Sequence, residues 1–343
     1  MIMKTPLLLF AILFPPICAT AQTPVTISAN DMRMRIGGTI QSQAGISSDT
    51  ETRAGFGVRR MRLRWYGDLG HNVKLFMQME GTGTPAFTDY RADWSVTDRT
   101  VIRVGRFVGT QPAAMAFTLH NEIDAIDRAV IGEQWALATR GSDARDFGVE
   151  LVHRAGDIEV RGFLHNGTNT QNITGRIGAP QPSANVSKQH VNISGMVRWL
   201  PAAHPNREFG AHLGLNPNAY GNIPRHVEAS AHAYWGSKVG SQPTRVKFDA
   251  ILLRRDSPGN RSLSGASLFF GRLLNEDLEL FGRAEWLDSF AFKQEAQRFG
   301  TIGLNRKLGS WNQNLKAAYS IRLSEAANTD PVHVAVMQWQ VYF

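Results

Sequence analysis

The chain has 343 residues, of which 43% are hydrophobic and 19% are charged. After the first 21 positions no apolar run is long enough for a membrane-spanning helix, which excludes a helical membrane protein. The ordinary apolar fraction excludes wholesale disorder. Lys and Arg number 37 against 29 Asp and Glu, and the net charge of +8 favours anionic partners.

Residues 1–21 are predicted to be a secretory signal peptide. Lys4 supplies the positive start, residues 7–14 form the apolar core, and small residues ending at Ala21 form the cleavage site. We therefore expect export from the cytoplasm, with residues 22–343 forming a single domain.

From residue 32 to the C-terminus, apolar and polar residues alternate in segment after segment, which predicts strands. The clearest segment alternates Met61, Leu63 and Trp65 with Arg60, Arg62 and Arg64. We count about 16 segments of the length that a tilted membrane strand needs. Short polar turns alternate with longer links, which is typical of outer-membrane barrels. The predicted fold is all-β: a transmembrane antiparallel β-barrel with short periplasmic turns, long extracellular loops and an inward-folded third loop.

Aromatic residues and the C-terminus favour a membrane barrel over a secreted β-sandwich. Most Trp residues fall on the apolar side of their strands, near predicted strand ends, where an interfacial aromatic belt lies. The last strand ends in Phe343, which resembles the signal read by the outer-membrane assembly machinery. We therefore predict a Gram-negative outer-membrane location, with membrane lipid and that machinery as partners.

The polar side of each strand should face the lumen, and a barrel of about 16 strands is wide enough to hold water. A polar wall of that width indicates a pore. The candidate selectivity residues on this wall are Arg33, Arg35, Arg60, Arg62, Arg64 and Arg103. The first five lie on two adjacent strands and should form a ladder that passes anions, because rows of Arg select anions. The alternative is that these arginines pair with acids from an inward loop.

The longest link, residues 108–145, is the candidate constriction loop. Its candidate residues are Glu122, Asp124, Asp127, Arg128 and Glu133. The link is net acidic and contains no Lys. An acidic loop facing a basic wall would make a transverse field, which predicts a general diffusion porin with weak ion preference as the alternative function.

The chain resembles the phosphate-selective porin O and P family of Gram-negative bacteria. The matching motifs are Arg59-Arg60-x-Arg62 leading to Gly67, Arg103-Val104-Gly105-Arg106-Phe107, Arg145-Asp146-Phe147-Gly148-Val149, Phe163-Leu164-His165-Asn166-Gly167, Thr301-Ile302-Gly303-Leu304-Asn305 and Phe343. The resemblance implies a trimeric 16-stranded porin for phosphate or other small anionic solutes, with an arginine ladder and constriction lysines. Arg60, Arg62 and Arg64 resemble the ladder, whereas the lack of Lys in the 108–145 link departs from the family.

An outer-membrane barrel enzyme is the alternative of another class. No G-x-S-x-G, H-E-x-x-H or P-loop motif occurs, but a triad dispersed in sequence needs no motif, and His120, His165 and His232 are candidate members. We expect no enzyme activity, cofactor or metal. Nucleic acid is not expected as a partner, because the arginines are dispersed on strands that face inward.

Overall fold

The computed structural model describes residues 25–29, 32–49, 54–116, 123–140, 144–167, 191–217, 225–256, 262–288, 296–325 and 329–343. The predicted signal peptide lies outside these residues. The strands are β1 (Val25–Ala29), β2 (Met32–Ser47), β3 (Ala54–Asp68), β4 (Val73–Glu80), β5 (Ala86–Thr97), β6 (Thr100–Phe107), β7 (Asp146–Ala155), β8 (Ile158–His165), β9 (Asn192–Trp199), β10 (Arg207–Asn216), β11 (Arg225–Trp235), β12 (Thr244–Asp256), β13 (Ser262–Asn275), β14 (Leu278–Asp288), β15 (Gln297–Leu308), β16 (Ser310–Ser324) and β17 (Val332–Tyr342). The helices are α1 (Ala113–Ala116) and α2 (Val130–Thr139).

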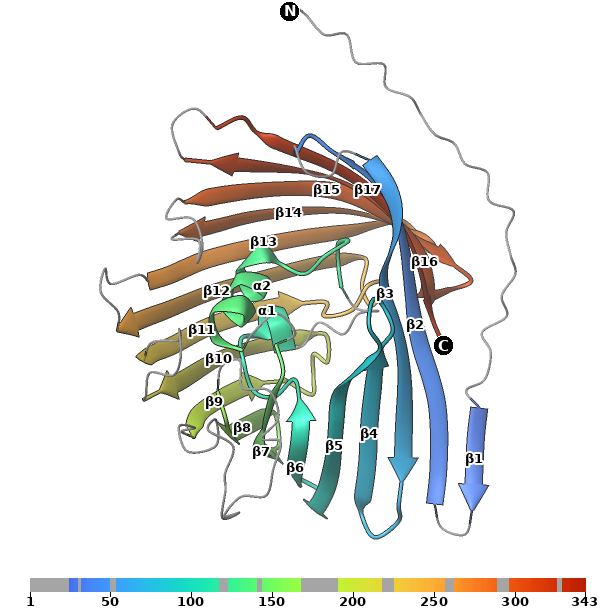
Figure 1. Ribbon diagram of the computed structural model, residues 1–343, viewed down its shortest axis with the longest axis vertical. Coiled ribbons are helices and arrows are strands. Elements are labelled where there is room, and N and C mark those ends of the chain that lie inside the picture. The colour runs from blue at the N-terminus through green and yellow to red at the C-terminus, as the bar shows by residue number, and fades with distance from the viewer. Residues whose placement is uncertain are drawn as a thin grey trace, which may run out of the picture.

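Strands β2 to β17 form a closed antiparallel barrel of 16 strands, because β17 pairs with β2 (Figure 1). The predicted strand number is therefore confirmed. The short β1 pairs with the first residues of β2, beyond the point where β17 ends. Phe343 closes this seam: its N–H donates to the Gly38 carbonyl at 3.1 Å, and Gly38 N–H donates to the Phe343 carbonyl at 2.8 Å.

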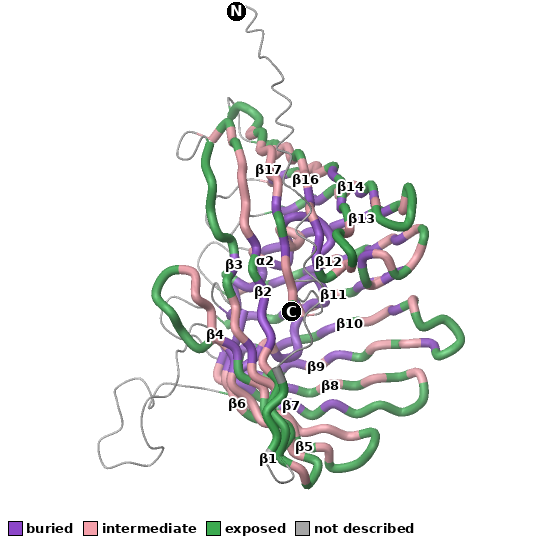
Figure 2. The backbone as a smooth tube through the Cα atoms, turned by 90° about the vertical axis from the view of Figure 1, so that its right-hand side faces the viewer, coloured by how far each residue is buried: buried purple, intermediate pink, exposed green. Residues whose placement is uncertain are grey.

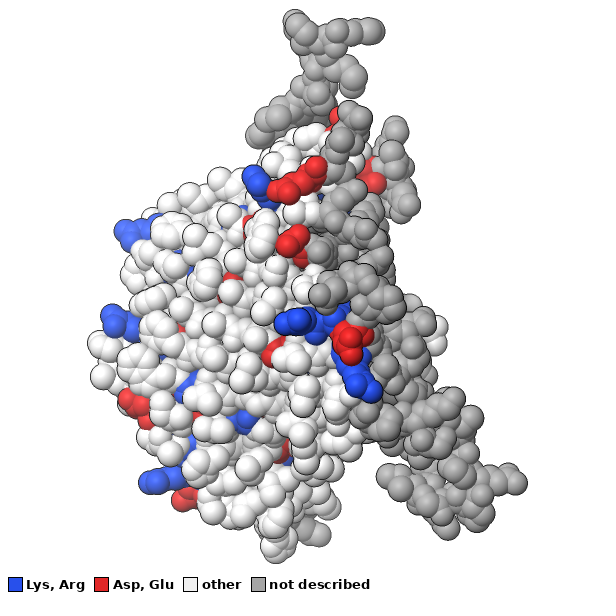
Figure 3. Space-filling view, turned by 90° about the vertical axis from the view of Figure 1, so that its left-hand side faces the viewer, with Lys and Arg blue, Asp and Glu red and all other residues white. Residues whose placement is uncertain are grey.

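The exterior of the barrel is apolar. Side chains such as Leu213, Leu268 and Ile302 are more than half exposed, which a soluble protein would not tolerate over a whole sheet. Buried and exposed residues alternate along the strands in Figure 2, and charged side chains are sparse on the face shown in Figure 3. In a closed barrel every strand has two partners, so this apolar surface can face lipid.

Connections sort by length between the two ends of the barrel. At one end the turns are short, such as the two residues between β7 and β8 and the single Gly309 between β15 and β16. At the other end the links are longer, and the longest runs over residues 108–145 between β6 and β7. The predicted short turns and long loops are confirmed, with exceptions: residues 200–206 and 236–243 form longer connections at the short-turn end, and residues 81–85 form a short link at the other end.

The third loop folds into the barrel and carries α1 and α2 (Figure 1). Helix α2 lies against the inner faces of β12, β13 and β14. Ile131 and Trp135 of α2 are fully buried there with Leu253, Leu263 and Leu287. This part of the inner wall is thus apolar rather than polar, because the loop covers it. No helix among the described residues is long and apolar enough to cross a membrane.

Candidate functional site

The candidate site is a cavity of about 1260 Å³ inside the barrel, lined by the third loop, by β2 to β6, and by single residues of β8 to β12 and β17. Among the described residues, fifteen Lys or Arg side chains and six Asp or Glu side chains line it. Cationic side chains therefore outnumber acidic ones by nine in this lining, in a lumen whose low-dielectric walls concentrate the field, although Arg59, Arg103, Arg161, Arg198 and Lys247 are paired with acids that lie behind it.

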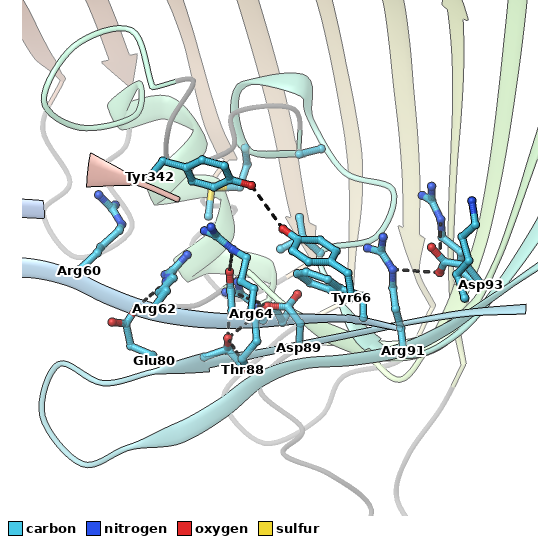
Figure 4. A pocket seen from close by; sticks show the side chains of 18 of the residues that line it. Arg60, Arg62, Arg64, Tyr66, Glu80, Thr88, Asp89, Arg91, Asp93 and Tyr342 are labelled. Carbon is cyan, nitrogen blue, oxygen red and sulfur yellow. Dashed lines mark hydrogen bonds and ion pairs between the residues drawn. The ribbon is translucent and has the colours of Figure 1, made fainter. Parts of the chain in front are cut away.

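Five of the predicted selectivity residues lie together on β2 and β3, and we call them the arginine cluster. They are Arg33, Arg35, Arg60, Arg62 and Arg64, and all line the cavity. Residues two apart on a strand share a face at a spacing of about 6.8 Å. Figure 4 shows Arg60, Arg62 and Arg64 following one another along this wall.

The hydrogen-bond partners of the arginine cluster show which of its members keep their charge for a passing anion and which are neutralised in an ion pair. Arg60 donates to Gln41 Oε1 at 2.8 Å, and Arg64 donates to Gln78 Oε1 at 2.7 Å. These acceptors are neutral, so they orient the guanidinium groups without cancelling their charge. Arg62 differs, because it forms an ion pair with Glu80 at 2.5 Å.

A β-bulge adds one cation that the alternation did not predict. Gln41 pairs with Arg60 and Ser42 pairs with Val58, so Arg59 is the extra residue of β3. Arg59 consequently lines the cavity beside Arg60 and forms an ion pair with Asp127 of the third loop at 2.9 Å. Strict alternation would place Arg59 toward lipid, and nothing in the sequence marks the bulge.

The acidic residues of the third loop do not all face the basic wall. Asp124 turns the other way and binds Arg245 at 2.5 Å and Lys247 at 2.8 Å on β12. The loop backbone is held on the same side, where Lys316 donates to the Ala125 carbonyl at 3.1 Å. Glu122 lies outside the described residues. Asp124 therefore serves to anchor the loop rather than to oppose the cluster.

Two predicted loop residues, Arg128 and Glu133, do line the cavity. Burial, followed by the positive charges of Arg60 and Arg62, lowers the pKa of Arg128 to about 9. Burial, followed by the negative charge of Asp127, raises the pKa of Glu133 above its ordinary value. The third loop thus places one cation, Arg128, among the wall cations, with the Glu133 carboxyl group near it.

Arg103 lies on a part of the barrel wall where cationic side chains are paired with acidic ones. Its Nη1 lies 2.8 Å from Glu150 Oε2, and its Nε lies 3.8 Å from Asp93 Oδ1. Further around the barrel, Arg198 lies 2.6 Å from Glu159. Cations and acids alternate along this stretch, so their fields largely cancel at a distance. Arg103 therefore contributes less net charge to the lumen than Arg60 or Arg64.

One set of side chains has the distances of a catalytic triad. Asp146 Oδ2 lies 2.8 Å from His165 Nδ1, and His165 Nε2 lies 3.0 Å from Ser194 Oγ. All three side chains are at most 2% exposed, and Ser194 Oγ accepts a hydrogen bond from Arg140 at 2.9 Å. A nucleophile needs access to substrate. This set instead holds Arg140, which follows α2, against the wall.

The two other candidate histidines for a triad are His120 and His232. His120 lies outside the described residues, and His232 Nε2 lies 3.0 Å from Glu208 Oε1 on the wall. Within the ranges that the structure describes, no group of three or more His, Cys, Asp or Glu side chains could hold a metal ion.

Comparisons with known proteins identify the architecture. In sequence, the chain matches no protein-family profile and no curated protein. In structure, it is similar to an anion-selective porin from Comamonas acidovorans, with a TM-score of 0.67 and 14% identity over 91% of this chain and 100% of that one. OmpF of Salmonella typhi in complex with daunomycin gives 0.64 and 10% over 92% and 100%. OmpT of Vibrio cholerae, an outer membrane protein in its trimer form, gives 0.60 and 12% over 91% and 99%. These likenesses establish that the chain has the fold of an outer-membrane porin.

Proposed function

We propose that the protein is a passive, anion-biased porin of a Gram-negative outer membrane. The observation that carries this proposal is the charge of the cavity, where cationic side chains outnumber acidic ones by fifteen to six. Arg60 and Arg64 add to that excess because their hydrogen-bond acceptors are neutral. The anion-selective porin among the similar structures is consistent with this function.

Small oxyanions, phosphate among them, are the proposed solutes. A guanidinium group forks onto oxyanions and stays charged at every physiological pH, which suits the arginine cluster to this task. The resemblance to the O and P porins favours phosphate, and the lack of Lys in the 108–145 link argues for weaker phosphate binding than in that family.

A homotrimer is the proposed assembly. It rests on the sequence resemblance and on the trimer form described for a similar barrel. Chemical crosslinking in detergent, followed by electrophoresis with and without heating, tests it: a heat-sensitive species three times the monomer mass is expected, and a monomer alone would contradict it.

The function is tested by the zero-current potential of the purified protein in a planar bilayer under a KCl gradient. Strong anion preference, with block of the chloride current by low phosphate concentrations, is expected for a phosphate channel. Anion preference without block would leave a general anion porin. Cation preference, or none, would overturn the proposal in favour of weakly selective diffusion.

A further inference from the structure

A row of two arginines and two aromatic side chains crosses the lumen wall, two residues further along β3 than Arg64. Cross-strand pairing places Arg35 opposite Tyr66, Tyr66 opposite Phe76, and Phe76 opposite Arg91. The row therefore reads cation, aromatic, aromatic, cation across β2 to β5. The two ring centroids lie 5.2 Å apart, tilted by 45°, and all four side chains line the cavity.

Tyr342, at the end of β17, extends the row on the side of β2. Its hydroxyl lies 3.4 Å from that of Tyr66, as Figure 4 shows, and Arg64 lies over its ring at 5.1 Å. The two tyrosines are thus flanked by Arg35 and Arg64. Tyr66, Phe76 and Tyr342 are only partly buried, so part of each ring faces the water-filled space.

Packing alone does not require these rings. The buried apolar clusters inside the barrel lie elsewhere, under helix α2 at β12–β14 and around Phe269 and Phe281, and the neighbouring pair of Arg64 and Gln78 is polar. An aromatic strip on a wet, cationic wall instead suits a solute that has both an apolar ring and a negative charge.

The stacked arginines keep their hydrogen-bonding capacity toward such a solute. Arg35 lies 5.5 Å from the centre of the Tyr66 ring, and stacking occupies the face of a guanidinium group while its N–H donors lie in the plane. Arg91 is already paired with Asp93 at 2.9 Å. Arg64 donates to the neutral oxygens of Gln78 and Thr39. Arg35 and Arg64 are therefore the arginines that offer charge to a carboxylate.

We propose that this strip is a binding subsite for aromatic carboxylates, with the carboxylate at Arg35 and Arg64 and the ring against Tyr66 and Phe76. The inference rests on the proposed anion-biased pore and names a solute class for it. It differs from phosphate binding because half of the recognition comes from aromatic contact, which phosphate cannot make. The two anions would share Arg35 and Arg64, but Tyr66 and Phe76 lie outside the arginine cluster, so substitution of an aromatic side chain separates the two kinds of anion.

Block of the chloride current by added benzoate, compared with acetate, tests the proposal in the planar bilayer. Both anions present one carboxylate, so their difference reports the ring. One aromatic contact contributes about 1 kcal/mol, so benzoate should block at roughly fivefold lower concentration than acetate. Equal block by the two anions, in a pore that still prefers chloride over potassium, would overturn the subsite and leave the proposed function standing. Loss of chloride preference itself would instead overturn the proposed function.

Two variants locate the effect. Phe76→Leu should bring the benzoate-to-acetate ratio toward one, whereas Arg35→Gln should weaken block by both anions. The matched control is Phe270→Leu, the same substitution at a side chain that is 49% exposed on the outer face of β13. The folded state of each variant is checked by its heat-modifiable migration on gels. A folded Phe76→Leu barrel that retains the full ratio would refute the placement of the ring.

Discussion

Glu80 is the acid that neutralises one member of the arginine cluster, so removing its charge should strengthen anion selectivity. Gln at this position keeps the shape and an oxygen that Arg62 can use, but it removes the negative charge that lies 2.5 Å from the Arg62 guanidinium. An ion passing one rung spacing away, about 6.8 Å, interacts with a unit charge by about 0.6 kcal/mol in water. Salt at about 0.1 M screens this to about 0.3 kcal/mol. Because the anion gains this energy and the cation loses it, the permeability ratio should rise about threefold.

The assay is the zero-current potential under a KCl gradient, with Arg64→Gln as the opposite perturbation. Glu80→Gln should raise the chloride-to-potassium ratio about threefold, and Arg64→Gln should lower it by a similar factor. Arg154→Gln is the control for the substitution itself, since Arg154 is exposed near the β7–β8 turn and does not line the cavity. A ratio unchanged in both lumen variants, at low as well as high salt, would refute the view that this cluster sets the selectivity.

Three further outcomes are expected. As the pH falls, anion preference should increase at a pH above about 4.3, the usual glutamate pKa, because the raised pKa of Glu133 makes this carboxyl group lose its negative charge at a higher pH. Glu133→Gln should show the increased anion preference already at neutral pH and should abolish its dependence on pH. Reversal potentials measured at several pH values test both expectations. Asp124→Ala removes the partner that Arg245 and Lys247 share, while Arg245 keeps its ion pair with Glu279 at 2.7 Å. The folded barrel should therefore lose about 3 kcal/mol, the low end of the range for a broken buried pair, which is measured as a lower temperature of heat modification. Deleting Phe343 should reduce the amount of folded barrel in the outer-membrane fraction of cells; an unchanged amount would argue against its role as an assembly signal.

The fold could be predicted from the sequence because the strands of a membrane barrel alternate apolar and polar residues. Each strand puts one side chain toward lipid and the next toward the lumen, so Met61, Leu63 and Trp65 separate from Arg60 and Arg62 without any knowledge of packing. The third loop was also predictable, since no other link approaches the length of residues 108–145.

The candidate site was only partly predictable. Parity and a shared hairpin were enough to place Arg60, Arg62 and Arg64 on one wall, because both are local properties of the chain. The aromatic strip is not among the predicted site residues, because alternation alone does not show which residues of adjacent strands are paired; in the structure Tyr66 pairs with Phe76 across the β3–β4 hairpin. The bulge that turns Arg59 inward depends on pairing irregularities that alternation does not encode.

The orientation of Asp124 shows why the net charge of a loop is a poor guide to the field that it makes. The sequence suggests an acidic loop that cancels a basic wall, but the loop must also be held in place across the lumen. Asp124 holds the loop by binding Arg245 and Lys247 on β12. Its negative charge therefore compensates cations that do not belong to the arginine cluster. Arg128, by contrast, remains at the cavity. Anchoring the loop thus keeps the charge of Asp124 away from the arginine cluster, whereas Asp127 and Glu133 of the same loop still face Arg59. The anion bias proposed here therefore depends on the cations of the wall and on where each loop carboxylate lies, rather than on the net charge of the loop.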